Sequence, residues 1–538
     1  MDLAVTPAPR GAPGGMTRSV AGMGAAAALS RIFGSLRMVV IAAVLGTTYL
    51  GNTFQASNSV SNVLFELLAA GALSAVLVPT FVDLLSAGDQ RRAEEVAGRV
   101  LSMALVVLGA VTLTGVAAAP FIARLLTTGV DDPTVAADQR ELATFLLRFF
   151  VPQILLYAIG AVSTAVLHAR GSFVLPALAP IGNTVVLVVS LVAFRQLAGA
   201  DPGLDLSTTE RLCLALGGTL GVAAFVAVPT VAMWRSGFRL RLGWRGARAD
   251  GDVRRLVRLS GWAVLQHAGT GILLAAALVV AGAVEGGVVA YQLAMVVFLA
   301  PYGIVAQPIH TAVLPRLAED AARGDQAALQ RAMRWATDAL VVATLPLAAG
   351  LAALSLPIME VLAFGEAGRG DGPSLLGGAL LGLALGVPVY GGFLLLTRAA
   401  YALGDSRTPA LASIGSALVG AVGMAVAGTV WDGTALLVGI GLAHSAAYGL
   451  GTLALARRLR GSVGPIGSWA HLRPLAVAAG AAGAAWLVVR AWHPGDRLGT
   501  ALAVTVAAAL AGAVYLGAVR SLGLGPGSAP PLQGVGTA

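Results

Sequence analysis

Long apolar runs dominate the chain, and only short polar joints separate one run from the next. Each run has roughly 20 to 30 residues, enough to cross a hydrocarbon core about 30 Å thick as an α-helix. The runs lack the every-second-residue alternation of membrane barrel strands. We therefore predict an all-α polytopic membrane protein with about fourteen spans, at 18–46, 52–86, 96–127, 139–168, 173–196, 209–234, 255–283, 287–318, 331–363, 374–402, 408–430, 434–457, 470–491 and 497–520.

The chain repeats itself at an interval of six spans. Residues 76–90 (VLVPTFVDLLSAGDQ) resemble residues 312–326 (AVLPRLAEDAARGDQ), at an offset of 236. Residues 169–179 resemble residues 402–412 at an offset of 233. An even number of spans keeps both copies in the same membrane orientation, so the pattern predicts two parallel-repeat lobes with a cleft between them.

The predicted organisation follows from these runs and repeats. It comprises a disordered cytoplasmic tail at 1–17, an N-terminal six-helix lobe at 18–234, a basic cytoplasmic joint at 235–254, a C-terminal six-helix lobe at 255–460, two additional transmembrane helices at 461–523 and a flexible tail at 524–538.

Charge is concentrated in alternate joints. Arginines crowd one set of joints, most densely between Arg235 and Arg258, whereas the other set is neutral or acidic. Arginine-rich joints stay on the cytoplasmic side of a membrane, so we expect both termini to be cytoplasmic. The net charge of +9 therefore reflects membrane topology and not a nucleic-acid partner.

Several chemistries are excluded by composition. Charged residues make up 11% of the chain, against about 25% in soluble proteins. Every basic residue is arginine, which excludes a Walker A phosphate loop. Cys213 is the one cysteine, and the six histidines are scattered without metal spacing. With no nucleophile–base pair either, we expect no enzyme activity, no cofactor and no metal site.

The first span carries two arginines, Arg31 and Arg37, within an apolar run. A charge at mid-bilayer costs about 2.5–3.5 kcal/mol on insertion scales, so buried charges suggest function. The two lie about 120° apart on a helix with Gly34 between them, so both can bracket one groove. Arginine forks match phosphate oxygens well. Alternatively, either one snorkels to the interface or pairs with a carboxylate.

The second span carries a polar stripe. Gln55, Asn58, Asn62 and Glu66 follow one another at helical spacing. Such a stripe must face protein or water and not lipid. Glu66 can pair with an arginine of the first span, or it can carry a coupling proton.

The second lobe has its own polar groups inside predicted spans. Gln307 and His310 share one face of the eighth span with Thr311, and Gln266 and His267 lie in the seventh. They can line the same cleft from the opposite side, or they can form hydrogen bonds between helices.

Prolines interrupt several predicted spans. Pro152, Pro301, Pro308 and Pro388 are expected to kink their helices and free backbone carbonyls.

Several stretches resemble the MurJ/MviN family of lipid II flippases, part of a wider superfamily of multidrug and polysaccharide-lipid exporters. They are SRIFGSLRMVVIAAVLG in the first span, GALSAVLVP in the second, GAVSTAVLHARGSFVLPALAP around the fourth and fifth, AVLPRLAE after the eighth and TRAAYALGDSRTPA after the tenth. The resemblance covers at least residues 30–412.

The resemblance implies a transporter that moves an undecaprenyl-diphosphate-linked peptidoglycan precursor, lipid II, from the inner to the outer leaflet by alternating access. It implies a cationic cleft for the diphosphate and sugar, in which Arg31 and Arg37 match two family arginines. It also implies a role in cell-wall biogenesis and cell shape at the bacterial inner membrane. We expect a monomer in contact with membrane lipids, with cell-wall synthesis proteins as candidate partners.

The chain departs from the family pattern at several charged positions. These now hold Met38, Asn52, Phe65, Glu66, Ala70 and Val296. The departures predict a less cationic cleft and leave two alternatives open. One is a multidrug or polysaccharide-lipid exporter of the related fold, and the other is a membrane scaffold for cell-wall synthesis that does not transport.

Overall fold

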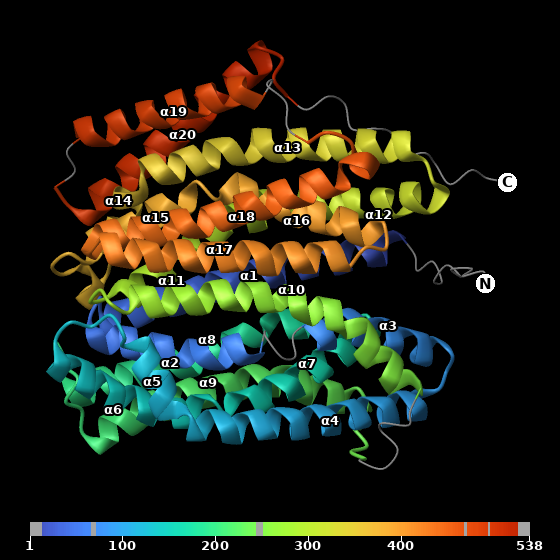
Figure 1. Ribbon diagram of the computed structural model, residues 1–538, viewed down its shortest axis with the longest axis horizontal. Coiled ribbons are helices and arrows are strands. Elements are labelled where there is room, and N and C mark those ends of the chain that lie inside the picture. Colours follow the sequence, from blue (N-terminus) through green and yellow to red (C-terminus); the bar gives the residue numbers. More distant parts are fainter. Residues whose placement is uncertain (1–12, 66–70, 244–250, 467–470, 493–494, 526–538) are drawn as a thin grey trace.

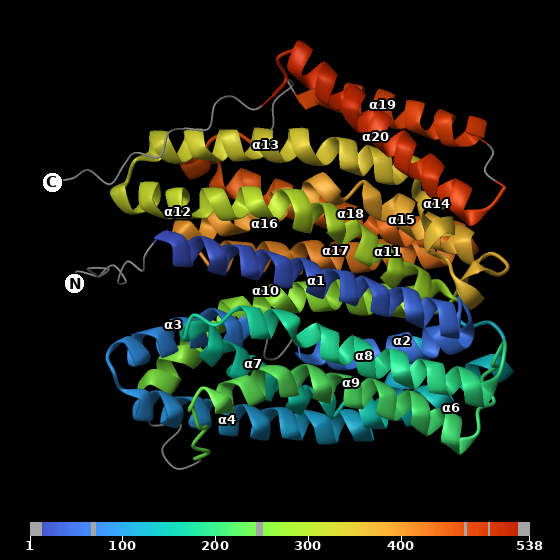
Figure 2. The ribbon, with the colours of Figure 1, turned by 180° about the vertical axis from the view of Figure 1, so that it is seen from behind.

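The computed structural model describes residues 13–65, 71–243, 251–466, 471–492 and 495–525, and within these it gives only the backbone of 13–28, 71–76 and 251–260. These residues form helices that run side by side in two stacked lobes, with no strand among them (Figure 1). Both chain termini leave the same end of the bundle, which we call the terminal end (Figures 1 and 2). We call the opposite end the far end.

The first lobe contains nine helices before the basic joint. They are α1 (Pro13–Leu45), α2 (Tyr49–Phe65), α3 (Gly71–Ser86), α4 (Gln90–Ala117), α5 (Ala119–Leu126), α6 (Pro133–Phe150), α7 (Gln153–Ala169), α8 (Val174–Ala198) and α9 (Thr208–Arg235).

The second lobe follows the basic joint. Its elements are α10 (Gly251–Ala281), α11 (Gly287–Pro301), the π-helical turn η2 (Tyr302–Ala306), α12 (Gln307–Arg323), α13 (Gln326–Ala353), α14 (Ser355–Leu362), the 3-10 turn η3 (Gly365–Gly368), α15 (Gly372–Ala384), α16 (Val387–Ala402), α17 (Arg407–Val430) and α18 (Gly433–Val463). The two additional helices, α19 (Leu472–Trp492) and α20 (Arg497–Ser521), pack outside this lobe against α13 and α14.

The helices are long and apolar enough to span a membrane. Eleven described helices pass on length and hydropathy, or twelve with the α15–α16 pair, which bends by 46°. The first two predicted spans correspond to α1 and to the α2–α3 pair, which lie only partly within the described side chains. The expected multi-pass helical fold is therefore confirmed.

Several predicted spans are interrupted along their length. The spans at 96–127, 139–168, 287–318, 331–363 and 374–402 all contain a break, and the span at 52–86 is divided between α2 and α3. Pro152 lies at the break between α6 and α7, Pro301 precedes the π-helical turn, and Pro388 begins α16. Proline removes a helical hydrogen bond and clashes with the preceding turn, which explains these kinks.

The internal repeat is visible in two matching turns at the terminal end. Gly88 and Gly324 both adopt positive φ, at 77° and 69°, a conformation that glycine tolerates best. Asp89 then caps α4, as Asp325 caps α13. Gln90 donates to the carbonyl of Gly237, and Gln326 donates to the carbonyl of Gly461. Each lobe thus ties the turn before α4 or α13 to its own last helix or to the segment just after it.

The apolar core is divided unequally along the bundle. In the far half, one cluster of buried side chains joins both lobes, for example Ile41 and Phe54 with Val289 and Leu437. In the terminal half, each lobe has a separate cluster, around Phe81 in the first lobe and around Leu340 in the second. The lobes therefore share one core at the far end and have separate cores at the terminal end, where α3 of the first lobe still packs along α10 of the second.

Candidate functional site: the boundary between the lobes

A pair of hydrogen bonds from Asn52 joins the lobes at the far end. Its Nδ2 donates to the carbonyl of Val284 over 2.7 Å, and its Oδ1 accepts from the backbone N–H of Val288 over 2.9 Å. Asn52 is buried, so both bonds are shielded from water. Residues 52 and 288 are separated by the repeat offset of 236, so this contact lies where the two repeats meet.

A second set of hydrogen bonds continues along the same two helices. Gln55 donates to Oε1 of Gln292 over 2.5 Å, and Gln292 donates to the hydroxyl of Ser59 over 2.7 Å. Together with the Asn52 contacts, these bonds form what we call the interlobe seal: Asn52, Gln55 and Ser59 of α2 with Val284, Val288 and Gln292. Gln55, the first residue of the predicted polar stripe on the second span, therefore faces the other lobe.

A loop of the second lobe packs against the first lobe at the far end. We call residues 363–371 the plug loop. Its Glu366 is buried and pairs with Arg195 of α8 over 2.8 Å and with Arg369. Glycines permit the close approach, because a Cβ on Gly365 would meet the carbonyl of Ala43 and one on Gly46 would meet Glu366. Across these contacts the plug loop ties the second lobe to the turn between α1 and α2.

The boundary between α1 and α12 is built differently. Arg31, which is exposed, donates to Oε1 of Gln307 over 2.6 Å. Its guanidinium also lies against Gly303 in the π-helical turn, where any Cβ would overlap it. At 1.5 Å per residue, Arg31 is about 20 Å from the far end of α1, inside the apolar part of the helix.

Arg37 points to a different neighbour. It lies half-buried in the first lobe, near Tyr157 of α7. The two arginines were predicted to bracket a single groove. Instead, Arg31 contacts Gln307 of the second lobe, whereas Arg37 lies beside α7 of the first lobe. Neither arginine has an ion pair with a carboxylate among the described residues.

The remaining members of the predicted stripe lie deeper along α2. Asn58 is buried and Asn62 is half-buried. Glu66 falls outside the described residues, so its predicted role stays a prediction.

The predicted residues of the second lobe do not all face the boundary. Gln266 accepts from the Tyr401 hydroxyl, and its carbonyl accepts from Ser413, so it joins helices within the lobe. His267 is exposed, whereas His310 is buried beside Tyr302. Of this set, Gln307 makes the described contact across the boundary.

Sequence reasoning missed Arg398. Its guanidinium donates to the Tyr302 hydroxyl over 3.3 Å, and Tyr302 precedes Gly303, against which Arg31 lies. The signal was present, because Arg398 stands in the TRAAYALGD stretch four residues before α16 ends. Gln292 was also missed, although an amide in an apolar run, near the repeat equivalent of Gln55, marks it out.

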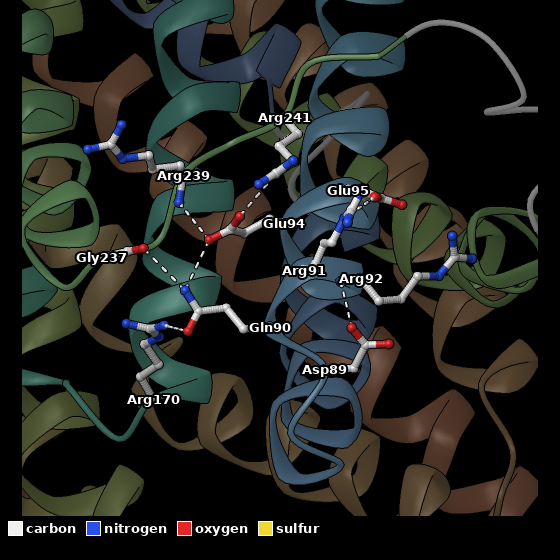
Figure 3. Close-up of polar contacts among 10 residues, drawn as sticks. All are labelled: Asp89, Gln90, Arg91, Arg92, Glu94, Glu95, Arg170, Gly237, Arg239 and Arg241. Carbon is white, nitrogen blue, oxygen red and sulfur yellow. Dashed lines mark hydrogen bonds and ion pairs between the residues drawn. The ribbon is translucent and has the colours of Figure 1, made fainter.

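The joint between the lobes begins with a docked segment. Glu94 of α4 is buried, accepts from the backbone N–H of Arg239 over 3.1 Å, and pairs with Arg241 over 3.3 Å (Figure 3). Gln90 donates to Glu94 and accepts from Arg170, which holds the α7–α8 turn in the same cluster. Residues 236–243 are thus fixed to the first lobe, and movement between lobes must arise beyond them.

These contacts define what the boundary can do. Guanidinium groups at Arg31, Arg37 and Arg398 can bind the oxygens of an anionic headgroup, since arginine forks suit phosphate. The described residues contain no cluster of His, Cys, Asp or Glu side chains able to hold a metal ion.

Comparisons with known proteins agree on one family. A family model described as lipid II flippase MurJ matches residues 41–506. A probable lipid II flippase MurJ of Rhizobium tropici is 28% identical over 392 residues, which cover 72% of this chain and 71% of that protein. One from Synechocystis sp. is 27% identical over 399 residues, covering 73% and 72%.

Solved structures share the fold. A lipid II flippase MurJ in an inward closed conformation aligns with a TM-score of 0.72 at 18% identity, covering 93% of this chain and 99% of that one. An inward-facing multidrug resistance transporter of the MATE family aligns with a TM-score of 0.62 at 14% identity, covering 80% and 95%. The predicted resemblance is confirmed by the match along most of the sequence, and the chain belongs to the lipid II flippase MurJ family.

Proposed function

We propose that this protein moves lipid II from the inner to the outer leaflet of the bacterial cell membrane, by opening the lobe boundary alternately at the two ends. The family assignment supports the substrate. The observation that carries the proposal is the exposed Arg31 inside the apolar part of α1, at the lobe boundary. A charge at that depth is costly unless it serves a ligand or a partner.

We assign the terminal end to the cytoplasm. The arginine-rich joints at that end support this orientation, as the positive-inside rule requires. At the far end, arginines are offset by acids, as in the pairs Arg211–Glu141 and Arg195–Glu366. In this orientation the interlobe seal and the plug loop close the boundary toward the outside.

The arginines would hold the diphosphate of the precursor. Arg31 and Arg37 belong to α1, and Arg398 reaches the same region from α16 through Tyr302. Their positive charges favour an anionic headgroup over a drug cation. Binding the diphosphate at Arg31 would replace its bond to Gln307 and so remove the described bridge between α1 and α12.

The lipid tail would leave the boundary between α1 and α12. On the opposite side of the bundle, α10 packs along α3, whereas α1 and α12 scarcely touch apart from the Arg31 contacts. Ile32 and Leu36 on α1 are 62% and 45% exposed beside Arg31, an apolar surface suited to an acyl chain. The headgroup would cross between the lobes while the tail remains in lipid.

The test is flipping of fluorescent lipid II in proteoliposomes. The variant with both Arg31→Ala and Arg37→Ala should lose flipping while inserting normally. Arg148→Ala is the matched control, because Arg148 is an exposed arginine on α6, away from the boundary, and should flip as the unaltered protein does. Undiminished flipping by the double variant would contradict the proposal.

Depletion in cells separates this proposal from the scaffold alternative. Loss of a flippase should cause lipid II to accumulate on the inner leaflet, and the double arginine variant should fail to restore its export. If the protein is a scaffold that does not transport, the double arginine variant should restore the depleted cells.

A further inference from the structure

A histidine is buried in the second lobe beside the interlobe seal. His444 of α18 is 4% exposed, and its Nδ1 lies 2.7 Å from the hydroxyl of Tyr291, itself fully buried. Its Nε2 has no hydrogen-bond partner among the described residues. The rings of Phe298 and Tyr448 pack against it, with centroids 6.2 and 5.2 Å away.

This arrangement is unusual for a structural histidine. Buried polar atoms are nearly always hydrogen-bonded, and one left unpaired calls for an explanation. A neutral imidazole has one donor and one acceptor nitrogen. Because Tyr291 occupies Nδ1, the unpaired Nε2 holds either an unused N–H or a lone pair free to take a proton. Ionisable groups within membrane helices often belong to proton pathways.

A row of phenol rings leads from His444 to the lobe boundary. The centroid distances are 5.2 Å from His444 to Tyr448, 4.7 Å from Tyr448 to Tyr390 and 5.1 Å from Tyr390 to Tyr302. All three tyrosines are partly exposed. Tyr302 precedes Gly303, against which Arg31 of the first lobe lies. The row therefore places three tyrosine side chains, with rings in contact, between the boundary and His444.

The titratable groups around this pair are few. Tyr291 from α11 and Tyr448 from α18 face His444 directly, Tyr390 from α16 follows, and Arg398 is the nearest charge along the row. Of the other helices that pack on α18, α15 has no titratable residue, α17 has only Arg407 at its start, α13 has Arg331, Arg334 and Asp338 in its first half, and the described part of α10 has His267. No described carboxylate therefore contacts His444.

The pair is linked to the seal through one helix. Tyr291 precedes Gln292, so α11 presents Tyr291 to His444 on one side and Gln292 to Gln55 and Ser59 on the other. A change in the Tyr291–His444 bond therefore moves Tyr291, the residue that precedes Gln292 of the seal.

We propose that the Tyr291–His444 pair is a proton-binding site whose protonation opens the interlobe seal. An imidazolium has two N–H donors, and in the sealed structure Nε2–H would be buried without an acceptor. Protonation thus disfavours this arrangement and favours one in which Nε2 reaches an acceptor or water. By linkage, the open state binds the proton more tightly, so lowering the pH populates it. The consequence for transport rests on the proposed function, whereas the proton site does not.

The experiment measures opening without any substrate. Spin labels replace Thr128 of the first lobe and Asp432 of the second, both exposed near the far end, in a Cys213→Ser background. The full-length protein is placed in lipid nanodiscs, and the label distances are recorded between pH 8 and pH 5. If the states differ by one proton, the ratio of open to sealed protein should rise by up to about tenfold per pH unit.

The variants assign the response to the pair. His444→Gln keeps a side chain able to bond Tyr291 but cannot titrate, and it should lose the pH response. Tyr291→Phe keeps the histidine without its partner and should shift the pH at which the ratio changes. His267→Gln is the matched control, because His267 is an exposed histidine on α10, and it should respond as the unaltered protein does.

Two outcomes overturn the proton site: an unaltered protein whose distances ignore pH, or a folded His444→Gln variant that still responds to pH. Flipping of lipid II is assayed in parallel. A seal that titrates in a protein unable to flip lipid II would uphold the site and reject the proposed substrate. Label distances indifferent to pH in a protein that still flips lipid II would reject the site and uphold the flippase.

Discussion

The two halves of the lobe boundary differ in how they are held. At the far end, a shared apolar core, the interlobe seal and the ion pair of Glu366 hold the lobes together. At the terminal end, each lobe has its own core, and the boundary between α1 and α12 is spanned by the Arg31 contacts. Parts with few buried contacts open at low free-energy cost, so the α1–α12 side of the terminal half is poised to admit a ligand and the far half to exclude it.

The repeat makes this difference informative. In the two-lobe arrangement, α10 is the equivalent of α1, and α3 is the equivalent of α12. The α3–α10 boundary is closely packed, whereas the α1–α12 boundary is not. Two equivalent boundaries thus differ because one carries an arginine bridge in place of continuous packing. Lateral access is expected at the bridge.

Removing Asn52 should cause the largest change in this comparison. Asn52→Leu leaves the carbonyl of Val284 and the N–H of Val288 without partners. Each unpaired buried group costs about 1–3 kcal/mol, so losing the two partners should weaken the seal by about 2–6 kcal/mol. The label distances across the far end should lengthen at pH 8. Asn62→Leu, on the same helix, is the control and should leave them unchanged.

Neutralising Glu366 should have the next largest effect. Glu366→Gln removes the charge that holds Arg195 and Arg369, and a charged hydrogen bond with one buried partner should contribute about 1.5–3 kcal/mol to closure. A double-mutant cycle with Arg195→Gln, read from the same distances, isolates the interlobe part. Additive effects would mean that this ion pair does not hold the lobes together.

Arg497 offers a smaller change that tests the two additional helices. It donates to the carbonyl of Ala363 and lies over the ring of Phe364 at 4.4 Å, so α20 braces the plug loop. Arg497→Gln should weaken closure by about 1 kcal/mol, the order of a partly exposed cation–π contact. Arg520→Gln, at the other end of α20, is the control. Equal label distances in the two variants would mean that α19 and α20 do not brace the plug loop.

Asp405 provides the smallest change, at the terminal end. Burial raises its pKa, but hydrogen bonds from Thr408 and the backbone, with the charge of Arg458, lower the pKa overall. The ionised form therefore stabilises the fold above about pH 4, and this contribution disappears as the pH falls through the lowered pKa. Asp405→Asn should reduce Tm at pH 7 by an amount that shrinks below pH 4. The far-end distances at pH 7 should not change.

Much of the fold could be predicted from the sequence, because span length and repeats depend on local pattern. Apolar runs gave the helices, and the Gly-Asp-Gln turns gave the repeat. The breaks inside spans were harder, since apolar residues continue across them. Pro152 marked one break in advance, whereas the break between α4 and α5 lies in a run of alanines before Pro120.

The site was only half accessible to sequence reasoning. Gln55 and Asn58 of the stripe on α2 are buried, whereas the partner of Gln55, Gln292, depends on how the lobes pack and could not be read from the pattern. Arg31 and Arg37 were identified by their cost in a membrane, yet their partners lie on two different helices, one in each lobe. His444 carried no sequence signal, because one histidine in an apolar run is compatible with a plain core position.

A disulfide across the interlobe seal tests the central claim most directly. Ser59→Cys and Gln292→Cys, introduced together in a Cys213→Ser background, replace two side chains that are in contact across the lobes. Our account predicts that oxidation stops lipid II flipping in proteoliposomes, that reduction restores it, and that each single-cysteine variant is indifferent to oxidation. Flipping at an unchanged rate by the cross-linked protein would contradict alternating opening of this boundary.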